Sequence, residues 1–108
     1  MKILGIKNCD KVRKTLKWCK DNDIEYSYHD FRQDGFDKQH LNELLIHFKL
    51  EELFNKRSTS WRALSNSQKE NLTNDLLLEN PTLIPRPVVI TNNNSGTLGY
   101  KPELWFND

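Results

Sequence analysis

The hydrophobic period changes twice within the first thirty residues, and this limits the folds open to the chain. Residues 2–6 (KILGI) form a short apolar run, which predicts a strand. From residue 8 or 9 to about residue 20 the apolar positions recur at helical spacing. This predicts an amphipathic helix with an inward face of Val12, Leu16 and Cys19. Residues 24–28 alternate like a half-buried strand, so we expect a parallel strand pair with a right-handed crossover.

The middle of the chain is predicted to be helical. Asp37 can cap a helix whose inward face is Leu41, Leu44, Leu45 and Phe48. A second helix is predicted from Ser67, where Ser-Gln-Lys-Glu matches a capping box, to Asn80, where a proline follows. Residues 55–62 between these helices are interpreted as a polar, cationic connector.

The C-terminal quarter predicts the rest of a sheet. Residues 88–90 (VVI) are typical of a buried strand, and residues 92–96 predict a turn into an alternating segment that reaches Tyr100. Pro102 suits the first turn of a terminal helix holding Leu104, Trp105 and Phe106. The order of these elements predicts an α/β domain with a small mixed sheet of about four strands.

Length and charge exclude several classes of protein. A chain of 108 residues suffices for one domain with a modest core. Its net charge of +1 argues against direct nucleic-acid binding, which needs a strongly basic surface. No apolar run approaches the roughly 20 residues of a membrane span, and no signal peptide is recognisable. We therefore expect a cytoplasmic monomer with reduced thiols and small-molecule or protein partners.

Cys9 stands where the first predicted strand ends and the first helix begins, and three interpretations are open for it. It could pack as a small hydrophobe, bind a metal ion or act as a nucleophile. We expect no metal site, because Val12 occupies the place of a CxxC partner and the histidines show no matching spacing. A helix N-terminus, with neighbouring lysines and Arg13, favours a thiolate, so we pursue the nucleophile. Cys19 is predicted to lie in the core.

The two cysteines are not expected to bond to each other. Ten helical residues separate Cys9 from Cys19 by about 15 Å along the helix axis. A disulfide tolerates a Cα separation of roughly 7 Å at most. If Cys9 forms a disulfide during turnover, the second thiol must come from outside the chain, from glutathione or a small glutaredoxin-type reductant.

A second set of candidate residues is cationic. Arg86 and Pro87 stand directly before the buried strand, and X-Pro bonds at such junctions are candidates for the cis isomer. Arg57 and Arg62 lie in the connector. Each arginine could be a solvated surface residue, yet guanidinium groups also hold oxyanions and carboxylates through forked hydrogen bonds. A thiol at a helix N-terminus together with such cations favours an anion-binding thiol site.

Four segments together resemble the ArsC/Spx group of thioredoxin-like proteins, and most closely its YffB subgroup. They are GIKNCDKVRK around Cys9, YHDFRQDG at 28–35, NKRSTSWRAL at 55–64 and IPRPVVIT at 84–91. The resemblance extends over nearly the whole chain. It implies a thioredoxin-like α/β fold, with a single domain over residues 1–108 and a helical insertion at about 37–79. It also implies one redox cysteine, and a cis Pro87 after a substrate-facing Arg86.

The resemblance also implies roles for individual positions. The nucleophile of arsenate reductases falls on Cys9, and one of their three oxyanion-binding arginines falls on Arg86. Their connector arginine falls on Asn55, with Arg57 two positions further on, and their C-terminal arginine falls on Lys101. Because asparagine and lysine lack the guanidinium fork, arsenate is not the expected substrate. The YffB-type proteins keep the arginine that corresponds to Arg57.

The leading hypothesis is a glutathione-dependent thiol-disulfide oxidoreductase in which Cys9 attacks an oxidised sulfur or oxyanion. Glutathione then releases the product, and no metal is needed. The residues expected to stabilise the thiolate or bind the substrate are Asn8, Arg13, Arg57, Arg86, Pro87 and Lys101. Two alternatives stay open: a true arsenate reductase, and a Spx-like, non-enzymatic protein that binds RNA polymerase. Val12 weighs against the second, because it interrupts the CxxC switch typical of such regulators.

Overall fold

The computed structural model describes residues 1–105, and the chain divides into two compact units. The sheet unit comprises residues 1–35 and the segment from Arg86 onward, and the helical unit comprises residues 36–85. That residues 1–108 form a single domain with a helical insertion at about 37–79 stays a prediction. No helix in the described part of the chain has the length and apolar character to cross a membrane.

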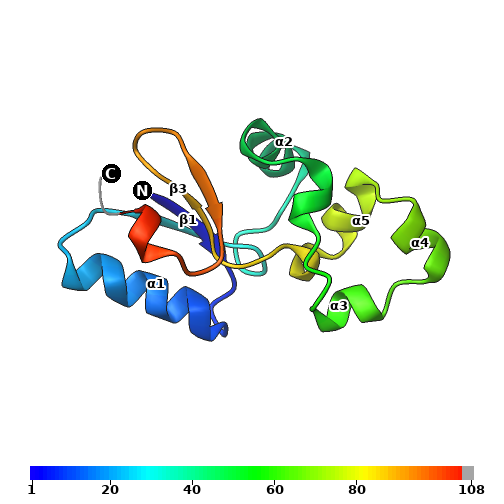
Figure 1. Cartoon of the computed structure of the whole chain (residues 1–108), viewed down its shortest axis with the longest axis horizontal. Coiled ribbons are helices and arrows are strands. Elements are labelled where there is room, and N and C mark those ends of the chain that lie inside the picture. The colour runs from blue at the N-terminus through cyan, green and yellow to red at the C-terminus, as the bar shows by residue number, and fades with distance from the viewer. Residues whose placement is uncertain (106–108) are drawn as a thin grey trace. The chain divides into compact units, whose positions relative to one another are not determined.

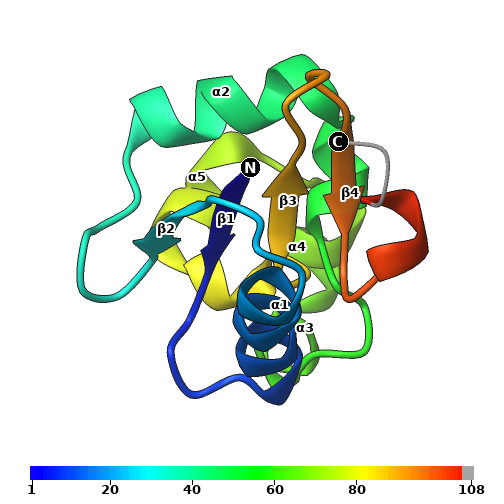
Figure 2. The ribbon, with the colours of Figure 1, turned by 90° about the vertical axis from the view of Figure 1, so that its left-hand side faces the viewer.

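The sheet unit contains four short strands in the order β2-β1-β3-β4 (Figure 2). Its elements are β1 (Lys2–Gly5), α1 (Asp10–Asp21), β2 (Ser27–Asp30), β3 (Val88–Ile90), β4 (Gly96–Leu98) and the 3₁₀ helix η3 (Pro102–Leu104). The pairing of β1 with β2 is parallel, whereas β3 pairs antiparallel with both β1 and β4. The predicted α/β class with a mixed four-stranded sheet is therefore confirmed.

One face of this sheet is covered by α1 (Figure 1). Ile3 and Val89 are paired across β1 and β3, and both side chains pack in a core cluster with Cys19 and Trp105. Cys19 is fully buried, so its predicted place in the core is confirmed. The indole N–H of Trp105 donates to the Thr97 hydroxyl at 2.8 Å, which satisfies the polar atom of this buried ring. The terminal helix is a single 3₁₀ turn, and Phe106 lies outside the described residues.

Two details of the sheet unit differ from the prediction. Leu16 is half-buried and packs against the core cluster as predicted, but Thr15 is also buried on this face of α1, and its hydroxyl donates to the Lys11 carbonyl at 2.7 Å. This local hydrogen bond lets a polar side chain occupy the buried face. The second strand begins at Ser27, not at residue 24, because the amide of Ile24 still donates to the carbonyl of Cys19 at 2.8 Å and so closes the end of the helix.

The helical unit consists of short helices. They are α2 (Lys38–His47), η1 (Leu50–Leu53), α3 (Thr59–Arg62), α4 (Asn66–Glu70), α5 (Asn74–Glu79) and η2 (Pro81–Leu83). The predicted cap of the first helix is confirmed, because the Asp37 side chain accepts from the His40 amide at 3.1 Å. Of its predicted inward face, Leu45 is only half-buried; the buried side chains are Leu41, Leu44 and Phe48.

The other helix predictions for this unit are wrong in part. Ser65, not Ser67, caps α4, because its hydroxyl accepts from the Gln68 amide at 3.1 Å and the two residues form the capping box. The expected single helix is two, since α4 ends at Glu70 and Thr73 caps a new helix through the Leu76 amide. The polar, cationic connector contains α3, which residues 59–62 form.

Candidate functional site

The ends of β1 and β2 define one edge of the sheet. Gly5, the last residue of β1, lies opposite Asp30, the last residue of β2. The chain leaves this edge through residues 6–8 and reaches Cys9, the N-cap residue of α1. The Cys9 amide donates to the Ile6 carbonyl at 3.2 Å, so the connection between strand and helix is one tight turn.

The other two strands bring further predicted residues to the same edge. Val88, at the start of β3, lies opposite Leu4 near the end of β1 and opposite Leu98 at the end of β4. Pro87 directly precedes this position, and its carbonyl accepts from the Gly99 amide at 2.8 Å. The segment after β4 reaches Lys101 three residues later. The strand pairing therefore places the segments that lead to Cys9, Pro87 and Lys101 at the same edge of the sheet.

Cys9 is a free, half-buried thiol at the N-cap position of α1. Its carbonyl accepts the first helical hydrogen bond, from the Arg13 amide at 3.0 Å. The amides of residues 10–12 have no backbone acceptor in the part of the chain that the structure describes, as expected at a helix N-terminus. The Cys9 side chain makes no capping hydrogen bond. The thiol is thus partly accessible and lies at the positive end of the helix dipole.

Arg13 does not face this site as an unpaired charge. Its guanidinium lies 2.7 Å from the carboxylate of Asp10, and both side chains are largely exposed. Asp10 directly follows Cys9 and places a negative charge in the first turn of the helix. The expected contribution of Arg13 to anion binding is therefore opposed by this ion pair.

Arg86 is half-buried, and the Arg86–Pro87 peptide is cis, as the resemblance implies. The Nε atom of Arg86 is buried and makes no hydrogen bond within residues 1–105, although the residue as a whole has an interaction partner. Asn8 and Lys101 are exposed. Arg57 is also exposed and belongs to the helical unit, where its amide donates to the Asn55 side chain at 3.0 Å. The other predicted site residues belong to the sheet unit.

A buried carboxylate at this edge was not among the predicted site residues. Asp30 is 2% exposed, and its amide donates to the Asp34 side chain at 2.9 Å. Its carboxylate accepts from the backbone amides of Lys7 (2.9 Å), Arg32 (2.8 Å) and Gln33 (3.0 Å) and from the hydroxyl of Tyr28 (3.3 Å). The bond to Lys7 ties Asp30 to the turn that carries Cys9. The only signal in the sequence was an aspartate inside the YHDFRQDG segment.

The hydrogen bonds around Asp30 determine the charges of the Asp30 and Tyr28 side chains. Burial alone would raise the pKa of the Asp30 carboxyl, but the three backbone donors and the Tyr28 hydroxyl together outweigh it and hold that pKa below the ordinary value of 3.8. Burial raises the pKa of Tyr28 to about 12, and the negative charges of Asp30, Asp34 and Cys9 add to this rise. At neutral pH the structure therefore holds a carboxylate and a neutral hydroxyl close to the turn of Cys9.

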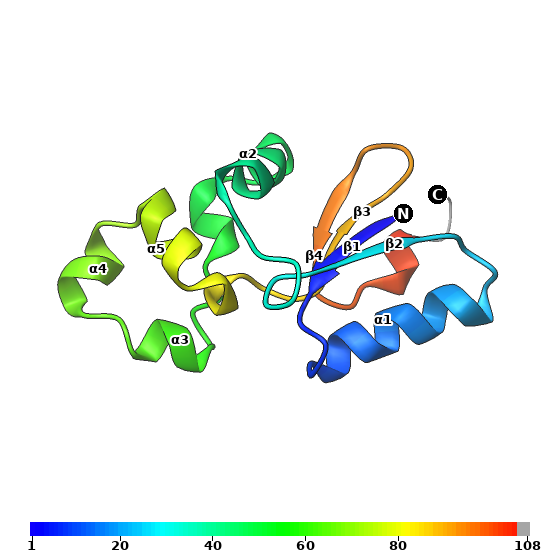
Figure 3. The same ribbon diagram turned by 180° about the vertical axis from the view of Figure 1, so that it is seen from behind.

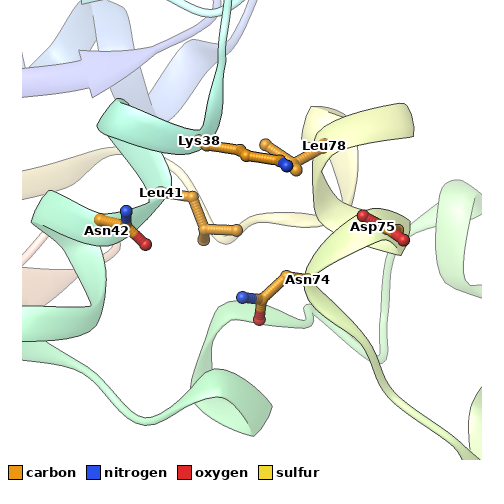
Figure 4. Close-up of a pocket in the computed structure, with 6 residues that line it drawn as sticks. All are labelled: Lys38, Leu41, Asn42, Asn74, Asp75 and Leu78. Carbon is orange, nitrogen blue, oxygen red and sulfur yellow. The ribbon is translucent and has the colours of Figure 1, made fainter.

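The helical unit has a cavity of its own, of about 290 Å³, between α2 and α5. Leu41 points into the space between these helices (Figure 4). The other lining residues are Lys38, Asn42, Asn74, Asp75 and Leu78. None of the predicted site residues lines it. Within residues 1–105, no group of three or more histidine, cysteine, aspartate or glutamate side chains could hold a metal ion.

The family model of the ArsC family matches residues 4–106. The chain belongs to the ArsC family. It is 46% identical to an uncharacterized protein of Haemophilus influenzae over 92 residues, covering 82% of this chain and 81% of that protein. It is also 27% identical to the regulatory protein MgsR of Bacillus subtilis over 100 residues, covering 88% and 79% of the two chains.

The fold agrees with this family membership. The solved structure of the YffB (PA3664) protein matches with a TM-score of 0.83 and 28% identity, covering 96% of this chain and 94% of that chain. The implied thioredoxin-like α/β fold and the resemblance to the ArsC/Spx group are thus confirmed. ArsC family proteins are thiol-based, which supports a thiol oxidoreductase-like or Spx-type protein with Cys9 as the accessible thiol.

Proposed function

We propose that this ArsC family member is a cytoplasmic, glutathione-dependent thiol-disulfide oxidoreductase with Cys9 as its nucleophile. The observation that carries the proposal is the position of Cys9. It is a free, partly accessible thiol at the N-cap of α1, on the sheet edge where the cis Arg86–Pro87 peptide and the approach to Lys101 also lie. Helix amides and nearby cations are the groups that favour a thiolate and an anionic ligand.

The proposed reaction has two exchange steps. The Cys9 thiolate attacks a sulfur of a mixed disulfide between glutathione and a substrate, forms a disulfide with glutathione and expels the substrate as a thiolate. A second glutathione thiolate attacks the glutathione sulfur of this adduct, which restores Cys9 and releases oxidised glutathione. Over the cycle one glutathione thiol is consumed, the glutathione sulfur of the mixed disulfide leaves in oxidised glutathione, and the substrate is released as a thiol.

The cationic residues are proposed to hold the glutathione carboxylates. Arg86 and Lys101 are the candidates supplied by the sheet edge, and Asn8 with the first-turn amides of α1 is proposed to stabilise the thiolate. Pro87 shapes the backbone beside the substrate. Arg57 enters this proposal only through the resemblance.

The test is an assay with glutathione, glutathione reductase and NADPH, in which several disulfides and arsenate are offered as substrates. Wild-type protein should oxidise NADPH with at least one disulfide, and Cys9→Ser should abolish this turnover. Cys19→Ala is the matched control, because Cys19 is fully buried and should not take part. Absence of any Cys9-dependent turnover would refute the proposal, and turnover with arsenate alone would identify an arsenate reductase.

A second candidate function is a non-enzymatic regulator that binds RNA polymerase. The similarity to MgsR, a regulatory protein by name, favours it. Affinity capture from a cell extract distinguishes the two functions. Recovery of polymerase subunits by wild-type protein and by Cys9→Ser alike, with no turnover in the glutathione assay, would support the regulator.

A further inference from the structure

A stretch of the helical unit carries positive charge without any acidic residue. Residues 55–69 contain four cationic side chains and no aspartate or glutamate, whereas the whole chain has a net charge of only +1. This stretch includes α3, the loop after it and the first four residues of α4, whose last residue is Glu70 (Figure 3). Because the whole chain is nearly neutral, this positive charge is local to the stretch and does not reflect the overall composition.

The fold brings two of these charges onto one aromatic ring. The Nζ atoms of Lys56 and Lys69 lie 5.8 Å and 5.9 Å from the centroid of the Trp61 ring. Both distances are in the range of a cation–π contact. The ring itself is held in place, because buried Phe54 packs edge-on against it at 6.1 Å and the Trp61 amide donates to the Ser58 hydroxyl at 3.0 Å.

A third cation lies near this ring in the sequence. Arg62 follows Trp61 directly, and its Nη2 donates to the Arg57 carbonyl at 3.2 Å. Neither Arg62 nor the two lysines forms an ion pair within residues 1–105. We call Lys56, Trp61, Arg62 and Lys69 the Trp61 patch. The ammonium groups of Lys56 and Lys69 in this patch repel each other. An anion bound beside them reduces this electrostatic repulsion.

We propose that the Trp61 patch binds an acidic segment of a partner protein. Charge complementarity with an unpaired cationic surface selects aspartate and glutamate side chains as the ligand. Single-stranded nucleic acid is less favoured, because base stacking requires an open aromatic face and two ammonium groups lie over the Trp61 ring. The proposal is independent of the Cys9 chemistry, and binding should be unchanged in Cys9→Ser.

Fluorescence anisotropy of a labelled oligoglutamate peptide tests this proposal. Lys56→Gln combined with Lys69→Gln should weaken binding about tenfold, since each lysine contributes a partly screened charge interaction. The matched control is Lys14→Gln with Lys20→Gln, which removes the same charge from exposed positions of α1. This control should change the affinity less than twofold, roughly the limit of a non-specific charge effect. Circular dichroism should show that both double variants fold.

Two further arms decide the class of ligand. An oligoglutamine peptide should not bind, and an oligothymidylate of equal length should bind more weakly than oligoglutamate. Trp61→Leu should also weaken oligoglutamate binding, because the lysines lose the ring that positions them. Equal losses in the patch and control variants, stronger binding of oligothymidylate, or no binding of oligoglutamate would each overturn the proposal.

Discussion

Asp10 places a negative charge beside Cys9, at the point where the helix dipole favours an anion. Asp10→Asn removes this charge and releases Arg13 from its ion pair. We therefore predict that alkylation of Cys9 by iodoacetamide at neutral pH becomes faster, by about two- to fivefold for a solvent-exposed charge. Alkylation is followed by mass spectrometry.

Asp21→Asn is the control for this experiment. Asp21 pairs with Lys17 at 2.6 Å and is also exposed, but it lies at the opposite end of α1. Its substitution should leave the alkylation rate unchanged. Equal acceleration in both variants would show that total charge, and not position beside Cys9, governs the rate.

Asp30 is predicted to make stability depend on pH. Its pKa in the folded protein lies below the ordinary value of 3.8, so its contribution to the free energy of unfolding is complete above that value. The contribution is lost as the pH falls through the lowered, folded-state pKa. Asp30→Asn should therefore destabilise the protein by about 1–3 kcal/mol at neutral pH, because buried donors lose a charged acceptor.

Urea denaturation at a series of pH values measures this effect. The difference between Asp30→Asn and wild type should shrink as the pH falls below 3.8. Asp23→Asn is the control, because Asp23 is exposed and asparagine tolerates its φ of 53°. A difference for Asp30→Asn that stays constant down to low pH would contradict the prediction.

At the scale of the secondary-structure elements, Gly5 of β1 lies directly against Val12 of α1. A Cβ atom at this position would lie 2.6 Å from Cγ2 of Val12, a buried and branched side chain that has little room to move. Gly5→Ala should overpack this contact and lower the free energy of unfolding by about 1–3 kcal/mol. Chemical denaturation measures the loss.

A double-mutant cycle separates this contact from other effects of the new methyl group. In the background of Val12→Ala the clashing Cγ2 is absent, so Gly5→Ala should cost less than it does in wild type. An equal cost in both backgrounds would assign the loss to the backbone of β1 instead of to its packing on α1.

The helix boundaries show which local sequence signals are sufficient to predict where a helix begins or ends. The cap at Asp37 was predictable, because an aspartate before a regular apolar stripe is a strong signal. The break between α4 and α5 was not, since Ser65, Ser67 and Thr73 are all acceptable caps. All residues of α4 are polar, so no apolar period in the sequence marks where this helix ends and α5 begins.

For the whole molecule, the structure predicts unequal reactivity of the two thiols. Ellman's reagent should react with Cys9 in the native protein and with both cysteines after denaturation, because Cys19 is 0% exposed. Mild oxidation in the presence of glutathione should add one glutathione, at Cys9. Intact-mass and peptide mass spectrometry measure both results, and an internal Cys9–Cys19 bridge as the main native product would contradict the helix geometry.

By itself the sequence determined the α/β class, the parallel pairing of the first two strands and the place of Cys9 between a strand and a helix. These features depend on side-chain period and on motifs of a few neighbouring residues, which can be recognised without knowing the fold. The tertiary structure alone decided that pairing starts at Ser27 and that Asp30 binds the turn before Cys9. It also decided that Lys56 and Lys69 share one ring. The bond between Lys7 and Asp30 joins residues 23 positions apart, and the two lysines reach the Trp61 ring only through the way this part of the chain folds, so no local pattern records either arrangement.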